Sequence, residues 1–170
     1  MFNTKKTFHS EYKRCSSGDL SIFEISALEK FNIIIQDNAE IYTFSRVEQK
    51  KIVYNCESYE KTHKRCSSYV KWEFNQKIYY GKILRFLKIN DKKVFIALQF
   101  KLLDIFESFD ISLKYNKIFK DYRLNDYFIS ASKNESSFMC CPVTSLLAIC
   151  IKIEKKDFQI LTEVFDYEHD

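Results

Sequence analysis

Residues 67 to 100 carry the clearest pattern of hydrophobic and polar positions in the chain. Three runs rich in aromatic and β-branched residues are separated by two short polar breaks, at residues 75–76 and 90–93. Within the first run, Val70, Trp72 and Phe74 alternate with charged residues, which indicates a strand with one buried and one wet face. Runs of this kind with short polar breaks are typical of neighbouring antiparallel strands. The stretch therefore predicts a three-stranded meander.

Gly81 lies in the middle of the second run, where a glycine usually marks a bulge or a close approach of backbone. Beyond it, large apolar residues occupy both odd and even positions. These are Ile83, Leu84, Phe86 and Leu87. Periodicity alone does not decide there between a bulged strand and a turn of helix.

Two helical segments are expected outside the meander. Ser21 and Glu24 have the spacing of a capping box, and apolar residues then recur every three positions, which predicts a short helix over residues 21–31. The expected apolar face consists of Ile22, Ile25, Leu28 and Phe31. Residues 101–123 form a mixed segment with several apolar residues near helical spacing, and we expect a further helix there.

Further strands are expected on both sides of the meander. Residues 40–47 and 51–55 form a pair joined across residues 48–50, and the predicted later strands are 127–132, 137–141, 145–154 and 158–165. The polar residues Lys133, Asn134 and Glu135 separate the first two of these later strands. The chain is therefore expected to be mainly β.

Composition supports a packed domain. The chain has 170 residues, of which 46% are hydrophobic and 16% aromatic, enough for one domain with its own core. We expect an N-terminal extension at 1–40 and a β domain at 41–170. With only 2 Gly and 1 Pro, the turns have to use Asn, Asp, Ser and Lys.

Net charge, hydropathy and cysteine content limit the ligands and the cellular compartments to be considered. A net charge of +4 is modest for a protein that coats DNA. No apolar run reaches the roughly 18 residues of a membrane span, and the first residues lack the apolar region of a secretory signal. We therefore expect the 6 cysteines to be reduced thiols, several of them buried, in the cytosol or nucleus.

Four blocks of sequence resemble a known class of domain: residues 53–59, 68–72, 80–83 and 142–150. Their order is similar to the β-rich domain at the ends of many DNA-transposon proteins and, more distantly, to the bromo-adjacent homology (BAH) module. The resemblance covers roughly residues 46–165 and departs from the pattern at Cys66. It implies an SH3/BAH-like, partly open barrel and a nuclear, non-catalytic module that docks on chromatin, a histone tail, DNA or a partner protein.

A basic loop is the candidate nucleic-acid site. Lys61, His63, Lys64 and Arg65 lie close together between two tyrosines, so cations could hold phosphates while a ring packs on a sugar or base. The alternative is an ordinary solvated loop between strands. A second basic stripe, Lys114, Lys117, Lys120 and Arg123, has the same two interpretations.

Aromatic residues are the candidate peptide site. Trp72, Tyr79, Tyr80 and Tyr59 could form a cage for a methylated lysine, because ring faces attract an ammonium group. The alternative is core packing, which occupies most aromatic residues in a chain this rich in them.

Metal binding and catalysis have little support. Cys56, His63 and Cys66 lie close in sequence, but no Cys-x-x-Cys pair is present, so we expect no metal and no cofactor. With two glycines the chain cannot build a Gly-rich phosphate loop, and no spacing marks an acid–base pair. We expect a binding module rather than an enzyme. A protein partner is favoured. The alternatives are a nucleic-acid-binding module that uses the basic loop at 61–65, and a scaffolding or interaction subunit with no role in chromatin. The ligand and the oligomeric state stay open.

Overall fold

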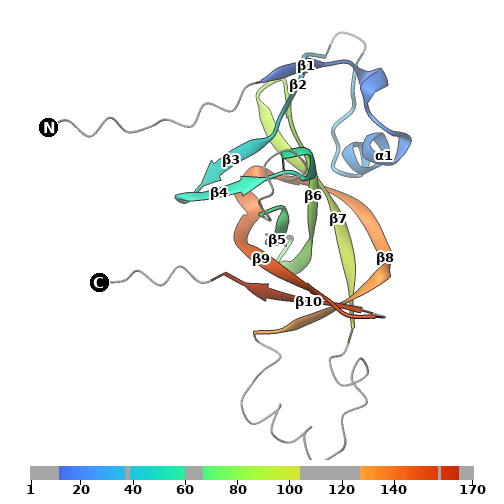
Figure 1. The fold of residues 1–170 in the computed structure, drawn as a ribbon. Coiled ribbons are helices and arrows are strands. Elements are labelled where there is room, and N and C mark those ends of the chain that lie inside the picture. Colours follow the sequence, from blue (N-terminus) through green and yellow to red (C-terminus); the bar gives the residue numbers. More distant parts are fainter. Residues whose placement is uncertain (1–11, 37–38, 60–66, 104–126, 157, 165–170) are drawn as a thin grey trace, which may run out of the picture.

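The computed structural model describes residues 12–36, 39–59, 67–103, 127–156 and 158–164 (Figure 1). The strands are β1 Lys13–Cys15, β2 Ile41–Phe44, β3 Arg46–Gln49, β4 Ile52–Asn55, β5 Tyr69–Phe74, β6 Lys77–Ile89, β7 Lys92–Leu103, β8 Ile129–Pro142, β9 Leu146–Glu154 and β10 Phe158–Glu163. The helix α1 spans Ile22–Lys30, and the 3₁₀ turns η1 and η3 span Ser17–Asp19 and Val143–Ser145.

Six strands close into a barrel, which confirms the expected mainly β, barrel-like fold. The order around the ring is β6-β5-β9-β10-β8-β7, and pairing of β7 with β6 closes it. The partly open barrel of the sequence analysis is thus a complete ring. Strands β1 and β2 extend the sheet outward from β6, while β3 and β4 form a separate hairpin beside the barrel (Figure 1).

The predicted meander is confirmed as β5, β6 and β7, paired antiparallel in sequence order. Its turns use residues other than glycine with positive φ: Asn75 and Gln76 have φ of 50° and 61°, and Asn90 has 52°. Lys50 and Lys51, between β3 and β4, have φ of 51° and 66°. Two consecutive positive φ values match the twist of hairpin strands, so the turns at residues 50–51 and 75–76 close tight hairpins without glycine.

The second strand of the meander is bulged rather than helical. The register between β6 and β7 shifts between Ile83 and Arg85, so that one extra residue enters β6. The extra residue places Ile83 and Phe86 on the same face of β6, in one hydrophobic cluster, whereas Leu87 is buried on the opposite face in another cluster. Gly81 lies four positions before Arg85, at a close approach: a Cβ there would overlap the Leu98 carbonyl oxygen.

Helix α1 begins at the predicted capping box. Ser21 accepts a hydrogen bond from the Glu24 amide, and the Glu24 side chain accepts one from the Ser21 amide at 2.8 Å. The predicted apolar face is wrong in part, because Ile22 is 76% exposed and the buried residues are Glu24, Ala27 and Leu28. The helix is rotated because Glu24 forms an ion pair with Arg85 of β6, at 3.1 Å.

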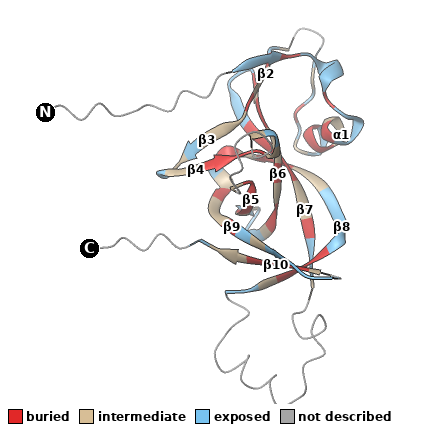
Figure 2. Cartoon of the chain, in the orientation of Figure 1, coloured by how far each residue is buried: buried red, intermediate tan, exposed pale blue. Residues whose placement is uncertain are grey.

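The two strands expected at 127–132 and 137–141 are one continuous strand, β8. Phe100 of β7 pairs with Ser136 and Leu102 pairs with Ala131, so three extra residues of β8 lie in a bulge between these pairs. The Ser132 hydroxyl accepts hydrogen bonds from the backbone amides of Asn134 and Glu135 in this bulge. The polar residues 133–135 therefore bend a strand instead of ending it, and this exposed bend is visible in Figure 2.

Three other boundaries differ from the prediction. The strand expected at 40–47 is divided at Ser45 into β2 and β3, and the hairpin turn lies at residues 50–51 rather than 48–50. Residues 101–103 belong to β7, so the further helix does not begin at 101, and residues 104–126 lie outside the described part. The basic stripe at 114–123 lies outside it as well.

Three hydrophobic clusters hold the fold together. The largest surrounds Trp72 and joins β2, β4, β5, β6, β7, β8 and β9. A second lies under α1 and joins the N-terminal residues to β2, β6, β7 and β8. The third takes one buried residue from each strand of the ring: Tyr69, Tyr80, Phe100, Ala131, Cys150 and Leu161. Residues 12–36 thus share core with the barrel strands, while the division at residue 40 stays a prediction.

Candidate functional site

The β6 and β7 strands separate at one end of the barrel. Their last pair is Gly81 with Gln99. Beyond it, residues 77–80 of β6 pair only with β5, and residues 100–103 of β7 pair only with β8. Two neighbouring strands of a closed ring therefore leave a gap between them.

A groove of about 600 Å³ occupies this gap. It is lined by Lys77, Ile78, Tyr79, Tyr80, Gln99, Phe100, Lys101, Leu102 and residues 135–137 of the β8 bulge. Ile78 and Leu102, one from each strand, are 43% and 45% exposed. Large apolar side chains this exposed on both sides of one groove mark a surface suited to binding an apolar partner.

The turn before β6 determines which backbone groups face the groove. A two-residue hairpin turn makes Phe74 and Lys77 the closing hydrogen-bonded pair, so Ile78 is in a pair without direct hydrogen bonds to β5. The N–H and C=O of Ile78 therefore point away from β5, toward the gap. Among the described residues, no residue of β7 pairs with Ile78.

The four residues of the expected aromatic cage are divided between core and surface. Trp72 is 0% exposed and packs edge-on against Phe95, with ring centroids 5.7 Å apart, so it presents no open ring face. Tyr79 stacks on Trp72 at 5.8 Å and also lines the groove. Tyr80 lines the groove but is 6% exposed. Both tyrosines line the groove, but Tyr80 is itself buried, and Trp72 lies in the core against Tyr79.

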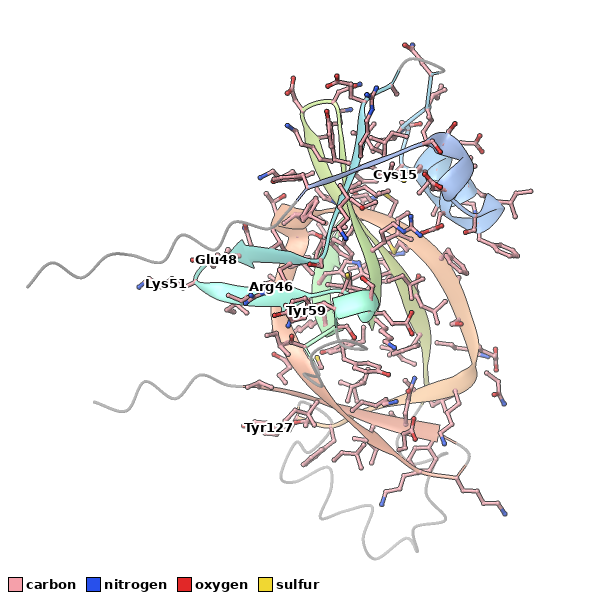
Figure 3. The ribbon with its side chains drawn as sticks, turned by 45° about the horizontal axis from the view of Figure 1, so that its top comes forward. Cys15, Arg46, Glu48, Lys51, Tyr59 and Tyr127 are labelled. Carbon is pink, nitrogen blue, oxygen red and sulfur yellow. The ribbon has the colours of Figure 1, made fainter. Side chains whose placement is uncertain are left out.

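The fourth residue, Tyr59, lies elsewhere. The Arg46 guanidinium of β3 lies over its ring, 5.0 Å from the ring centroid. Figure 3 labels both residues beside the β3–β4 hairpin. The groove lining does not include Tyr59. The basic loop Lys61, His63, Lys64 and Arg65 lies outside the described residues, so its role in nucleic-acid binding stays a prediction.

A network of ion pairs and tyrosines lies beside the groove. Lys71 donates to Glu163 at 2.7 Å, although the two residues are 92 positions apart, and the Tyr80 hydroxyl donates to the same carboxylate at 3.4 Å. Burial, followed by the nearby Glu163 charge, raises the pKa of Tyr80. Its phenol therefore stays protonated near neutral pH and acts as a donor, not a base. The network fixes the position of Tyr80 at the groove.

The five described cysteines are free and buried. Cys140 and Cys141 point into different hydrophobic clusters, and Cys150 into a third, so they do not converge on one point. Among the residues the structure describes, no three His, Cys, Asp or Glu side chains form a group that could hold a metal ion. His63 and Cys66 lie outside that part of the chain.

The buried thiols predict a loss of stability at alkaline pH. Burial raises the pKa of Cys140, Cys141 and Cys150 from 9.0 to about 12. Because the unfolded chain loses these protons first, the free energy of unfolding should fall as the pH rises from about 9 toward 12. Urea unfolding at a series of pH values measures this, and Cys150→Ala should reduce the slope. Rapid alkylation of these three thiols in the native protein at pH 8 would contradict their burial.

A scan against protein-family models and searches of curated proteins and solved structures give no match to this chain. The resemblance to transposon-encoded and BAH domains thus rests on the sequence motifs and stays a prediction. No helix in the described ranges is long and apolar enough to cross a bilayer. The sequence does not predict the groove, because its pattern indicates that β6 and β7 pair along their whole length.

Proposed function

We propose that this protein is a non-catalytic binding module that holds an extended segment of a partner protein in the groove between β6 and β7. One observation carries the proposal: the pairing of β6 with β7 stops at Gly81 and Gln99, and an apolar groove takes its place. An unpaired strand edge is a template for another strand. Addition of a strand to such an edge is a common mode of peptide recognition.

The bound segment would run along the free side of residues 77–80. Backbone hydrogen bonds to the N–H and C=O of Ile78 would supply affinity that does not depend on sequence. Alternate side chains of the segment would then point toward Ile78 and Leu102, because side chains in a strand alternate between faces. We expect apolar residues at every second position of the ligand.

Charged residues at the edge of the groove would add to its selectivity for the bound segment. Lys101 is paired with Glu135 at 2.7 Å, whereas Lys77 is exposed and has no carboxylate partner among the described residues. An acidic residue near the end of the segment closest to the β5–β6 turn would therefore be favoured. The gain is expected to be modest, because exposed ion pairs contribute about 0.2–1 kcal/mol.

The proposed function is still that of a binding module, as the sequence predicts. The binding surface is now the groove between β6 and β7, in place of an aromatic cage or the basic loop. A chromatin-associated partner in the nucleus is the setting that the resemblance implies. Histone-tail peptides therefore belong among the ligands to test, beside peptides chosen only for alternating apolar residues and one acidic end.

Removal of the two exposed apolar groove residues is expected to weaken peptide binding at least tenfold. The variant Ile78→Ser with Leu102→Ser loses the apolar contact on both sides of the groove. The matched control is Ile151→Ser with Ile153→Ser, two β9 residues of similar exposure, at 51% and 41%. Binding is measured by Trp72 fluorescence, since the Tyr79 ring connects the groove to Trp72.

N-methylated peptides give the second arm of this test. Methyl groups on the backbone amides that face β6 should abolish binding, while methyl groups on the intervening amides should have little effect. Equal loss with both methylation patterns, or equal loss in the two double variants, would refute strand addition in this groove.

A further inference from the structure

A row of basic and aromatic residues crosses the outer end of the sheet, away from the groove. Arg14 of β1 pairs with Tyr42 of β2, Tyr42 with Lys88 of β6, and Lys88 with Lys93 of β7. Directly paired residues in antiparallel strands point to the same face. Four strands thus present Arg, Tyr, Lys and Lys side by side on one surface.

A second row of rings lies beside the first, two residues along each strand. Tyr12 packs on Phe44 at 5.2 Å, and Phe44 stacks on Phe86 at 5.3 Å. Tyr12 is 45% exposed, and the Lys93 ammonium lies 5.9 Å from its ring centroid. The basic row is therefore bordered by an exposed ring on a rigid, packed base.

The cations of the row are not neutralised by the described part of the chain. Arg14, Lys88 and Lys93 have no carboxylate within ion-pair distance there, whereas Lys71, Lys82, Arg85, Lys101 and Lys152 each have one. Lys13 and Lys92 add two further cations at the same end of the sheet, on its other face, because each lies one position from a residue of the row. Glu11, Glu40 and Asp91 are acidic residues close to the row in sequence. The local charge is positive.

We infer that this row binds single-stranded nucleic acid, independently of the peptide groove. Arg14, Lys88 and Lys93 would hold successive phosphates, and Tyr42 and Tyr12 would stack on bases, since every base offers a face to a ring. Single strands fit this arrangement, because their bases are free to reach rings that lie on a sheet. A duplex would expose only its phosphates to the same surface.

The two sites lie at opposite ends of β6. Tyr80 of the groove and Lys88 of the row are separated by eight residues of β6, at most about 27 Å at the rise of an extended strand. The described residues of the groove and of the row do not overlap. Loss of one activity with retention of the other therefore distinguishes failure of this inference from failure of the peptide proposal.

The test is fluorescence anisotropy with a labelled 12-nucleotide oligothymidine over a range of salt concentrations. In the variant Arg14→Ala, Lys88→Ala, Lys93→Ala, affinity should fall at least tenfold, and the slope of log affinity against log salt should decrease by about 2. The control Lys133→Ala, Lys155→Ala, Lys156→Ala removes the same charge from exposed positions elsewhere and should change both quantities little.

Tyr42→Leu tests the stacking role separately. It should weaken oligothymidine binding about tenfold without changing the salt slope, because it removes a ring but no charge. Circular dichroism and peptide binding confirm that each variant is folded. Equal losses in the two triple variants would overturn the inference. Equally tight binding of heparin, duplex DNA or anionic vesicles, with no effect of Tyr42→Leu, would overturn it as well.

Discussion

Replacement of Gly81 by alanine is expected to lower the free energy of unfolding by about 3 kcal/mol or more. A Cβ at this position would overlap the backbone carbonyl of Leu98 on the neighbouring strand and lie 3.0 Å from Cη2 of Trp72. A carbonyl in a paired strand cannot move away as a flexible side chain can. The β6–β7 pairing, which closes the ring, would have to separate at its last pair.

Gly18→Ala is the matched control. A Cβ at Gly18 would have its nearest contact at 3.7 Å, to the Ser16 hydroxyl oxygen, which is an ordinary van der Waals distance. The φ of Gly18 is not positive, so alanine should be neutral or stabilise by a few tenths of a kcal/mol. Urea unfolding of both variants measures the difference. Equal stability of Gly81→Ala and the wild type would show that β6 and β7 do not approach this closely.

Trp72→Ala is expected to cost about 3–5 kcal/mol, because it removes the largest fully buried side chain in the main cluster. Its ring contacts Tyr79 and Phe95, and no described element can collapse into the space without breaking strand pairs. The prediction separates two roles for this residue. Truncation of a core residue lowers the free energy of unfolding, whereas truncation of a surface cage residue lowers mainly the affinity for the ligand.

Trp72→Phe serves as the conservative comparison. The indole N–H lies beside the Cys141 thiol but makes no hydrogen bond of ordinary geometry, so phenylalanine loses volume without leaving a new unsatisfied group. It should cost clearly less than alanine in urea unfolding. A stable Trp72→Ala protein with lost affinity for a methylated peptide would instead restore the cage expected from the sequence.

Local features of the fold were readable from the sequence because their causes lie within a few residues. Ser21 and Glu24 satisfy the first amides of α1 by themselves, and this motif placed the helix correctly. Asn75 and Gln76 accept the positive φ of a tight hairpin turn, which separated β5 from β6. The alternation around Trp72 marked a half-buried strand, and the mid-strand Gly81 marked a close backbone approach.

Errors arose where the surroundings, rather than the segment, determine the outcome. The face of α1 depends on Arg85, a residue 61 positions after Glu24, whose ion pair turns Glu24 inward and Ile22 outward. Polar residues 133–135 resemble a turn, but strand β7 beside them keeps β8 continuous through a bulge. Neither neighbour is visible in a local window of sequence.

The sequence by itself determined the β class, the meander, and the helix with its cap, since these follow from local hydrogen bonds and side-chain periodicity. Only the tertiary structure decided that the ring closes, that Trp72 is core, and that Tyr79 and Tyr80 border a groove. Arg14 and Lys88 meet in one row only through the register of β1, β2 and β6. Register between distant strands is set by packing of the whole sheet, so both candidate surfaces depend on contacts that no short stretch of sequence encodes.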